Sequence, residues 1–259
     1  MPVGMRLDLA DRRCVVTGAG RGIGLAVVGL LAEEGAEVIA AGRSRERLAP
    51  ALEAGAAEAL ELDVTAVDAG ERMARAGRVD VLVNNAGTAA SKALEEETDE
   101  DWERQWRLNV LGPWRLMRAV VPPMAERGWG RVVNVSSSAG KRPSSIGAAY
   151  SVTKAAELSL SRVFADAYAG RGVLINAIAP GAVASELWVG EGGLADQRAA
   201  AADSTREEVL AAQGAKLPVG RMGTPEEIAA VIAFLCSERA AFVSGAAWSV
   251  DGGTVPGIL

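Results

Sequence analysis

Histidine is absent from all 259 residues of the chain. This absence excludes a Ser-His-Asp hydrolase, a histidine general base and any metal site with an imidazole ligand. Proton transfer at a reaction centre must therefore use tyrosine, lysine, aspartate, glutamate or cysteine side chains.

Long basic and long apolar runs are missing too. With a net charge of −6 and no lysine- or arginine-rich segment, we expect no binding to nucleic acid or to an anionic membrane. No apolar run is as long as a membrane span, and residues 1–13 lack the apolar part of a signal peptide. Only two cysteines occur, Cys14 and Cys236, and both fall in apolar segments. We therefore expect a cytoplasmic protein with buried reduced thiols rather than a disulfide.

The chain does have enough apolar material for a large core, because 49% of its residues are hydrophobic and the mean hydropathy is +0.15. Short β-branched runs alternate with longer amphipathic ones. Strands are predicted over residues 12–17, 37–41, 58–62, 79–83, 130–136, 173–178 and 246–250. Helices are predicted over residues 22–34, 45–54, 66–76, 99–127, 149–169 and 225–237. No linker or repeat divides the chain, so the predicted fold class is α/β. It is one doubly wound domain over residues 1–259, with a seven-stranded, mainly parallel sheet and helices on both faces.

A glycine-rich segment, Thr17–Gly24, lies between the first predicted strand and the first predicted helix. It lacks the spacing G-x-G-x-x-G and instead reads T-G-x-x-x-G-x-G, with Gly18, Gly22 and Gly24. Glycines let a backbone approach a pyrophosphate, and a helix N-terminus offers free N–H groups and a positive dipole. The segment indicates phosphate binding, although a tight strand-to-helix turn would use the same residues.

Tyr150 and Lys154 stand four residues apart in a predicted helix, so they share one face. A neighbouring ammonium favours the phenolate form of tyrosine, as a general acid or base requires. Upstream, residues 136–138 are three serines at the carboxyl end of a predicted strand, where one hydroxyl could hold a substrate oxygen. By themselves, these residues could equally be a solvated helix face and a polar turn.

Pro113 falls inside the predicted helix over residues 99–127. Proline has no N–H, and its ring clashes with the carbonyl four residues earlier, which belongs to Asn109. We expect a break there that leaves this carbonyl free to bind an ordered water. A kink used only for packing is an equally good interpretation.

Several other predicted strands end in small or polar residues. Residues 84–87 are Asn-Asn-Ala-Gly, and Asp63 follows the third strand, where it could accept bonds from an adenine or cap a turn. Pro180-Gly181 ends the sixth strand, and residues 184–216 interrupt the last repeat with a helical stretch over 194–212. Ligands bind at this edge of such sheets, so we expect residues 184–216 to be a mobile substrate lid rather than a plain surface insertion.

These motifs together resemble the short-chain dehydrogenase/reductase family, from Leu9 to Gly253. The matching segments are Thr17–Gly24, Asp63-Val64, Asn84–Gly87, Asn109, Ser137, Tyr150 with Lys154, Asn176 with Pro180-Gly181, and Ser249–Gly253. The resemblance implies a Rossmann fold, a nicotinamide cofactor, a small-molecule carbonyl or alcohol substrate, no metal, and a homotetramer built partly from the two long helices.

The resemblance also implies a role for each matching residue. Ser137, three residues before Gly140 and thirteen before Tyr150, would hold the substrate oxygen. Tyr150 would transfer the proton, Lys154 would favour the phenolate and bind the ribose, and Asn109 would hold a water through its carbonyl. The implied cofactor-binding residues are Gly18, Arg21, Gly22, Ile23, Gly24, Arg43, Asp63, Val64, Asn85, Ala86, Gly87, Tyr150, Lys154, Pro180, Gly181, Val183 and Ser185. Ser185 stands where the family has threonine, which weakens the expected contact with the carboxamide.

The end of the second predicted strand bears on the choice of cofactor. NAD-binding members carry an acid there, but this chain has Gly42 followed by Arg43. A glycine leaves room for a 2′-phosphate, and guanidinium groups of Arg43 and Arg21 could pair with it. We expect NADP rather than NAD, the alternative being that Arg43 is only a surface residue.

The predicted activity is therefore hydride transfer between NADP(H) and a carbonyl or secondary alcohol, with 3-oxoacyl thioesters or small ketones as substrates. The short segment between Asp63 and Asp80 resembles tetrameric carbonyl and xylulose reductases, whereas the commonest relatives are 3-oxoacyl-carrier-protein reductases. An apolar pocket wall is expected from Leu187, Trp188, Val189 and Met222, and an acidic carrier protein could meet Lys141-Arg142. Two alternatives stay open: an NAD-dependent secondary alcohol or sugar dehydrogenase, and a non-catalytic NADP redox sensor or scaffold.

Overall fold

The structure, a computed structural model, describes residues 7–88 and 92–257. Seven strands form one sheet in the order β3-β2-β1-β4-β5-β6-β7, and every neighbouring pair is parallel. The strands are β1 (Arg13–Thr17), β2 (Glu37–Gly42), β3 (Glu58–Glu61), β4 (Val81–Asn84), β5 (Gly130–Val135), β6 (Val173–Pro180) and β7 (Ala247–Val250). The order reverses between β1 and β4, which creates a crevice at their carboxyl ends.

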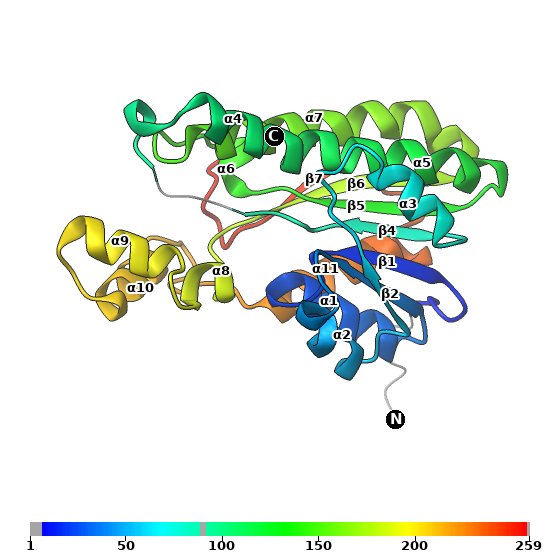
Figure 1. Ribbon diagram of the computed structural model, residues 1–259, viewed down its shortest axis with the longest axis horizontal. Helices are drawn as coiled ribbons and strands as arrows, with labels where there is room; N and C mark the ends of the chain where they lie inside the picture. Colours follow the sequence, from blue (N-terminus) through cyan, green and yellow to red (C-terminus); the bar gives the residue numbers. More distant parts are fainter. Residues whose placement is uncertain (1–6, 89–91, 258–259) are drawn as a thin grey trace.

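Helices cover both faces of the sheet (Figure 1). The helices α1, α2 and α11 lie on one face, and α3, α4, α5 and α7 lie on the other, while α8, α9 and α10 stand apart at the edge where the strands end. Their bounds are α1 (Gly22–Glu33), α2 (Ala49–Glu53), α3 (Ala69–Arg75), α4 (Asp99–Trp106), α5 (Gly112–Glu126), α6 (Ser138–Lys141), α7 (Ala148–Tyr168), α8 (Glu186–Val189), α9 (Leu194–Ala202), α10 (Arg206–Ala215) and α11 (Pro225–Cys236). Short 3-10 turns are η1 (Glu46–Leu48), η2 (Leu94–Glu96), η4 (Ala169–Arg171) and η5 (Glu238–Ala240).

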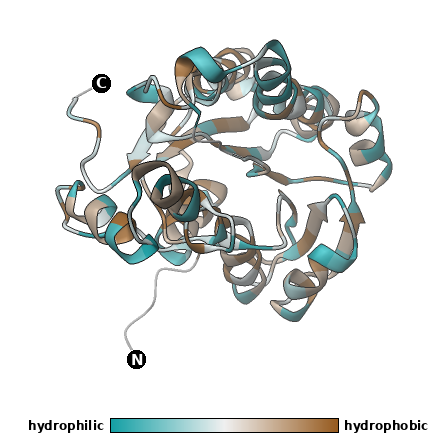
Figure 2. Cartoon of the chain, turned by 60° about the vertical axis from the view of Figure 1, so that its left-hand side comes forward, coloured by the Kyte–Doolittle hydropathy of each residue, from teal (hydrophilic) through white to brown (hydrophobic). Residues whose placement is uncertain are grey.

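Alternate strand residues face opposite sides of the sheet and build two separate cores. Cys14 and Val16 pack with α1 and α11, whereas Val15 packs with α3 and α5. Figure 2 shows the result, with hydrophobic colour along the strands and hydrophilic colour gathered on the outward helices. A strand that is buried on both faces needs a continuous apolar run, which is why these segments are readable in the sequence.

The predicted doubly wound α/β fold is confirmed, with every strand within two residues of its predicted bounds. Both cysteines are buried and free, as expected. Within the described ranges, no helix has the length and hydropathy needed to cross a membrane.

The predicted long helix over residues 99–127 is continuous but changes its winding in the middle. Between α4 and α5, residues 107–111 form a π-helix, η3, in which the Gly112 amide donates to the carbonyl of Arg107, five residues earlier. Pro113 has no N–H to donate within the helix, and the widened turn accommodates its ring without ending the helix. The predicted break is therefore a π-helical bulge. Bulges of this kind are frequent at functional sites, and Asn109 lies within this one.

The predicted helical stretch over residues 194–212 is helical, but it is divided into the two helices α9 and α10. Asp203, with a φ of +49°, ends α9 in the left-handed region. Thr205 then begins α10 with a capping box, in which its hydroxyl accepts from the Glu208 amide at 3.2 Å. Local hydrogen bonds of Ser, Thr and Asp side chains thus outweigh the alanine-rich composition.

Candidate active site

A cleft of about 1300 Å³ opens at the carboxyl ends of the strands, next to the crevice between β1 and β4. Most of the predicted site residues line it: Gly18, Arg21, Gly22, Ile23, Arg43, Asp63, Val64, Asn85, Ala86, Gly87, Ser137, Tyr150, Lys154, Pro180, Gly181, Val183 and Ser185. Gly24 and Asn109 are not among the lining residues and are buried behind the wall. Segments far apart in the sequence therefore meet around one cavity, which is large enough for a dinucleotide and a second molecule.

The glycine loop at one end of the cleft needs its glycines. Gly18 and Gly22 have φ values of +64° and +54°, a region that other residues adopt only with strain. A Cβ on Gly22 would also lie 3.2 Å from the Cβ of Ser185. The loop leads into α1, whose first N–H groups receive no side-chain cap from Arg21. An uncapped helix N-terminus beside an open glycine loop fits the pyrophosphate of a dinucleotide.

Thr17 joins this loop to the loop after β4, a role that the sequence analysis missed. Its hydroxyl accepts from the amides of Asn85 and Ala86, both at 3.0 Å, and is 3.3 Å from the carbonyl oxygen of Val83. The Asn85 side chain returns two bonds, to the carbonyls of Thr17 and Gly18, at 2.9 and 3.1 Å. Asn85 therefore helps to shape the cleft wall through its contacts with the backbone of the glycine loop.

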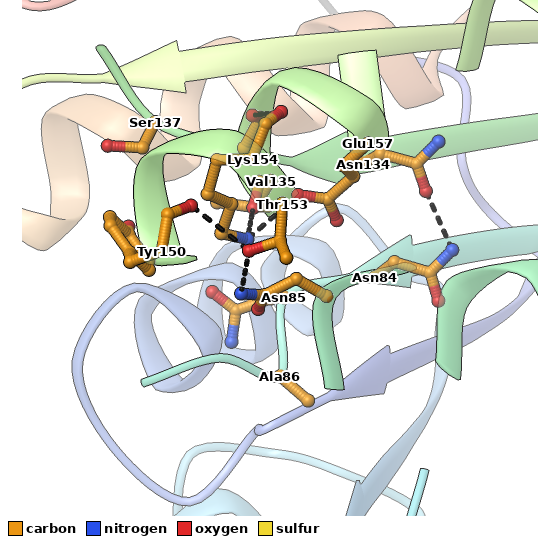
Figure 3. A network of polar contacts seen from close by, with 12 residues as sticks. Asn84, Asn85, Ala86, Asn134, Val135, Ser137, Tyr150, Thr153, Lys154 and Glu157 are labelled. Atoms are coloured by element: carbon orange, nitrogen blue, oxygen red, sulfur yellow. Dashed lines mark hydrogen bonds and ion pairs between the residues drawn. The ribbon is translucent and has the colours of Figure 1, made fainter. Parts of the chain in front are cut away.

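Tyr150 and Lys154 lie on α7 at the other end of the cleft (Figure 3). The Lys154 Nζ is 6.0 Å from the centre of the Tyr150 ring and donates to the Val135 carbonyl at 2.8 Å. This bond fixes the ammonium against the end of β5, close to the phenol. Both residues of the Y-x-x-x-K pair thus face the cleft, as the helical spacing predicts.

The three serines after β5 differ in what their hydroxyls contact. Ser136 is buried and donates to the Lys154 carbonyl at 2.8 Å, which commits it to holding α7 against β5. Ser137 is the N-cap of the short helix α6, where its Oγ accepts from the Ala139 amide at 3.1 Å. A hydroxyl that only accepts a bond from the protein still has a proton to donate toward the cleft, and this favours Ser137 over Ser136.

Asn109 is fully buried behind Tyr150 and Lys154. Its Nδ2 donates to Gln105 Oε1 at 2.8 Å and to Thr153 Oγ1 at 3.0 Å, so α7 and η3 are joined beside the site. Its Oδ1 has no hydrogen-bond partner within the described part of the chain. A Cβ built on Gly87 would be 3.9 Å from this oxygen and 3.8 Å from Lys154 Nζ, which places a buried, unpaired acceptor near the lysine. Such a group is usually satisfied by water.

The sequence analysis missed a buried acidic residue beside Lys154. Glu157 is only 1% exposed, and its Oε2 lies 2.8 Å from Lys154 Nζ (Figure 3). Burial raises the pKa of Glu157 to about 7, although the neighbouring ammonium of Lys154 acts in the opposite direction. The signal was present in the sequence, since residues three apart on a helix share a face and an acid on a buried face needs a partner.

The end of the cleft opposite Tyr150, around β2 and β3, carries exposed cations. Arg43 is exposed and follows Gly42, where a Cβ would meet the flexible end of Leu48 at 3.0 Å. Burial acts to raise the pKa of Asp63, but hydrogen bonds from Thr65, together with Arg43, lower it overall. Of the two roles considered for Asp63, the structure shows the turn cap, since its Oδ1 accepts from the Thr65 amide and hydroxyl at 2.9 and 2.7 Å.

The segment α8–α10 supplies the remaining wall. Leu187 and Trp188 line the cleft as expected, but the other two predicted wall residues, Val189 and Met222, are not among its lining residues. The expected basic pair is also separated, because Lys141 Nζ donates to the Ala247 carbonyl at 2.6 Å while Arg142 lines the cleft. The two side chains point to different places because α6 ends at Lys141 and the backbone of Arg142 is no longer helical.

Residues 18–255 match the family described as Enoyl-(Acyl carrier protein) reductase, and this match includes the glycines of the loop, the Tyr150–Lys154 pair and the strands β2 to β7. The chain belongs to the short-chain dehydrogenase/reductase family. The resemblance inferred from the motifs is thereby confirmed. Members of this family are oxidoreductases that act on alcohols and carbonyls, so the chain is an oxidoreductase of this type.

Two curated members of the short-chain dehydrogenase/reductase family illustrate its range. The chain is 40% identical over 255 residues to 2-(S)-hydroxypropyl-CoM dehydrogenase 3 of Xanthobacter autotrophicus, covering 95% of this chain and 97% of that protein. It is 34% identical over 261 residues to the 3-oxoacyl-[acyl-carrier-protein] reductase of Thermotoga maritima, covering 97% and 100%. The family is certain, but its members differ in substrate.

Solved structures of the family agree with the fold. L-sorbose reductase from Gluconobacter frateurii, complexed with NADPH and L-sorbose, has a TM-score of 0.90 at 30% identity, covering 98% of this chain and 100% of that one. A variant of actinorhodin polyketide ketoreductase with NADPH has a TM-score of 0.87 at 32% identity, covering 94% and 97%.

Proposed function

We propose that this short-chain dehydrogenase/reductase is an NADP(H)-dependent oxidoreductase that interconverts a carbonyl and a secondary alcohol, with Tyr150 as the general acid and base. The observation that carries the proposal is that one cleft joins an uncapped helix N-terminus after the glycine loop to Tyr150, Lys154 and Ser137. A nicotinamide cofactor bound along this cleft would supply or accept the hydride at the carbonyl carbon. The chain itself must then hold the oxygen and move one proton.

Each residue at the Tyr150 end has a separate task. Ser137 donates a hydrogen bond to the substrate oxygen, and Tyr150 gives that oxygen its proton in reduction or removes it in oxidation. Lys154 favours the phenolate by its charge, and it stays in place because Val135 and Glu157 both hold its Nζ. Asn109 supports a water near Lys154 that returns the proton from solvent. Its unpaired Oδ1 is a suitable acceptor beside the backbone carbonyl first predicted for this role.

NADP rather than NAD is proposed from the residues around β2. Arg43 and Arg21 line the cleft where the adenosine ribose would lie, and no acid stands at Gly42. A 2′-phosphate would be attracted by the two guanidinium groups, whereas an acid would repel it. The remaining cofactor contacts are assigned to Gly18, Gly22, Ile23, Asp63, Val64, Asn85–Gly87, Pro180-Gly181, Val183 and Ser185, with Gly24 supporting the loop from behind.

The segment α8–α10 is proposed as the substrate lid. Its two ends are tied together by a parallel bridge between Val183 and Gly223, in which the Ala184 amide donates to the Gly223 carbonyl at 2.9 Å. The segment between these ends lines the cleft through Trp188 and Leu194 but stands apart from the sheet (Figure 1). A segment attached at one point in this way can close over a substrate as a unit.

A homotetramer is proposed from the outer faces of the long helices. Trp102 and Trp106 on α4 are 36% and 43% exposed, and Val152 and Val163 on α7 are 43% and 64% exposed. Large apolar side chains gathered on such faces are typical of surfaces that bury one another between copies. Light scattering coupled to size-exclusion chromatography measures the assembly directly.

The test of the function is NADPH and NADH oxidation with a panel of β-ketoacyl thioesters, diketones, ketoses, and cyclic and steroid ketones. Turnover with NADPH that is lost in Tyr150→Phe would support the proposal. Turnover only with NADH would refute the assignment of Gly42 and Arg43 to NADP. Tight NADPH binding with no turnover in either direction would refute the catalytic role and support a redox sensor instead.

A further inference from the structure

The charged residues that line the cleft are distributed unevenly. Its acidic lining residues are Glu46, Asp63 and Glu186. Glu46 and Asp63 belong to the β2 and β3 end, and Glu186 Oε2 lies 3.2 Å from where a Cβ of Gly22 would be, over the glycine loop. Arg142, which follows α6, and Arg198 of α9 also line the cleft, and no acid from α6, α7, α9 or α10 is among the lining residues. The wall of the cleft that these elements form therefore carries positive charge within the described structure.

Arg198 is the more deeply placed of these two cations. It lies on α9, and its guanidinium stacks over the Trp188 ring of α8, with 4.6 Å between Cζ and the ring centre. Its Nη1 donates to Gln213 Oε1 of α10 at 3.1 Å. Contacts from two neighbouring helices thus hold the guanidinium in one orientation, with Trp188 itself only 8% exposed. A fixed guanidinium loses little freedom when it binds a ligand.

No carboxylate pairs with Arg198 among the described residues. The next arginines along the chain are different, since Arg206 pairs with Asp196 at 3.2 Å and Arg221 pairs with Glu227. Burial lowers the pKa of Arg198, and no neighbouring acid opposes that effect. A guanidinium has five N–H donors, and a neutral amide oxygen and an aromatic face leave most of them for another acceptor. A half-buried cation without a counter-ion costs stability, and a ligand anion would remove that cost.

We infer that Arg198 binds an anionic group on the substrate, so that the enzyme acts on ketones or secondary alcohols that carry a carboxylate, sulfonate or phosphate near the reacting carbon. Arg142, whose Nη1 donates to the Thr254 carbonyl at 3.4 Å, adds positive charge to the same cleft. The apolar faces of Trp188, Leu187 and Leu194 would contact the chain between the carbonyl and the anion. The inference rests on the proposed function, because it names the substrate class of that site.

The test compares each acid with its own uncharged ester. The substrates are 3-oxobutanoate, 4-oxopentanoate and 5-oxohexanoate, each with its methyl ester, followed by 3-oxobutane-1-sulfonate. For the best chain length, the wild type should have a KM at least about tenfold lower for the anion than for the ester, the size of a charge-assisted hydrogen bond. In Arg198→Gln, the ratio of the two KM values should collapse by about 10- to 100-fold, while Arg198→Lys should retain part of it.

Arg206→Gln is the matched control, because it removes one positive charge from the same segment at a residue that does not line the cleft. It should change the ratio by less than about twofold, since the charge of Arg206 is already paired with Asp196 and lies outside the cleft lining. Equal KM values for acids and esters in the wild type would refute the inference while leaving the reductase function intact. An equal loss for both in Arg198→Gln would show that Arg198 only packs the lid.

Calorimetric binding of the same acids and esters to the NADPH-loaded protein separates the two proposals. Anion-selective binding that is lost in Arg198→Gln, without any turnover, would support the role of Arg198 and refute the reductase function. Binding that does not depend on charge would refute the role of Arg198, whatever the activity.

Discussion

The two ends of the cleft are built in opposite ways. Around Tyr150, the supporting residues Asn109, Lys154 and Glu157 are all at most 3% exposed. Asn109 and Lys154 each donate a hydrogen bond to another element, and Glu157 is paired with Lys154 within α7. Around β2, Arg21 and Arg43 are exposed and form no ion pair with a described residue. The buried end has positions fixed by packing, as a reaction centre requires. The exposed end has charge without rigid geometry, which would be enough to select the 2′-phosphate of the proposed cofactor.

This contrast predicts that substitutions at the buried end change the rate or the stability strongly, while those at the exposed end change only the choice of cofactor. The four tests below are ordered by the expected size of the effect.

The largest effect is expected from Tyr150→Phe, which keeps the ring and removes only the hydroxyl. We expect kcat to fall by about 10³-fold, the contribution of a positioned general acid. Steady-state kinetics measures the loss, and NADPH binding followed by fluorescence should stay within a few fold of the wild type. A variant with more than about a tenth of the wild-type kcat would show that another group transfers the proton.

The next effect is expected in the pH dependence of stability, from the buried Glu157. Its pKa in the folded protein is about 7, above the ordinary value of 4.5. Between these values the unfolded chain has released the proton and the folded chain still holds it, so the free energy of unfolding falls as the pH rises. The loss should reach roughly 3 kcal/mol and level off above about pH 7.

Urea unfolding of the wild type and of Glu157→Gln between pH 4.5 and 8 measures this loss, because glutamine cannot ionise. The wild type should lose stability relative to the variant as the pH rises. A constant difference across that range would mean that Glu157 is ionised throughout, as a strong pair with Lys154 would require.

A smaller effect is expected from Thr17→Val, at the contact between the glycine loop and the loop after β4. Valine has the same shape but accepts no hydrogen bond, so the amides of Asn85 and Ala86 lose their partner. We expect a loss of about 2 kcal/mol in unfolding free energy and weaker NADPH binding, while Thr17→Ser should keep both. Unchanged NADPH affinity in the valine variant would separate the loop after β4 from cofactor binding.

The smallest effect is expected from Gly42→Asp at the exposed end. An acid there would repel the 2′-phosphate and shift the ratio of kcat/KM from NADPH toward NADH by about tenfold or more. The melting temperature should change little, because the new Cβ meets only the flexible end of Leu48 at 3.0 Å. If the ratio does not move, Arg21 and Arg43 do not lie beside the phosphate.

The fold was largely predictable because its strands are buried on both faces. Each strand then needs a short, continuous apolar run, such as the one from Cys14 to Val16, and such runs are visible without any tertiary information. The segment α8–α10 was predicted less well, since it has no such constraint. There, the left-handed Asp203 and the Thr205 cap ended one helix and began another within an alanine-rich stretch.

The candidate site divides in the same way. Tyr150 and Lys154 could be paired from helical spacing alone, and the glycines could be recognised from their spacing before a helix. The residues that join the walls of the site could not be recognised, because their partners come from distant segments: Thr17 bonds Asn85 across 68 residues, and Asn109 bonds Thr153 across 44. Arg198 was missed because nothing local distinguishes it from the solvated arginines around it.

By itself, the sequence determined the alternation of strands and helices, the glycine-rich turn and the Tyr150–Lys154 pair, since each depends on residues near one another in the chain, and its composition excluded histidine chemistry. Only the tertiary structure decided that Ser136 holds α7 while Ser137 is free to donate, that Glu157 is buried against Lys154, and that Arg198 lines the cleft without a carboxylate. Burial and the identity of a partner depend on which surfaces meet, and that is set by the packing of elements distant in sequence.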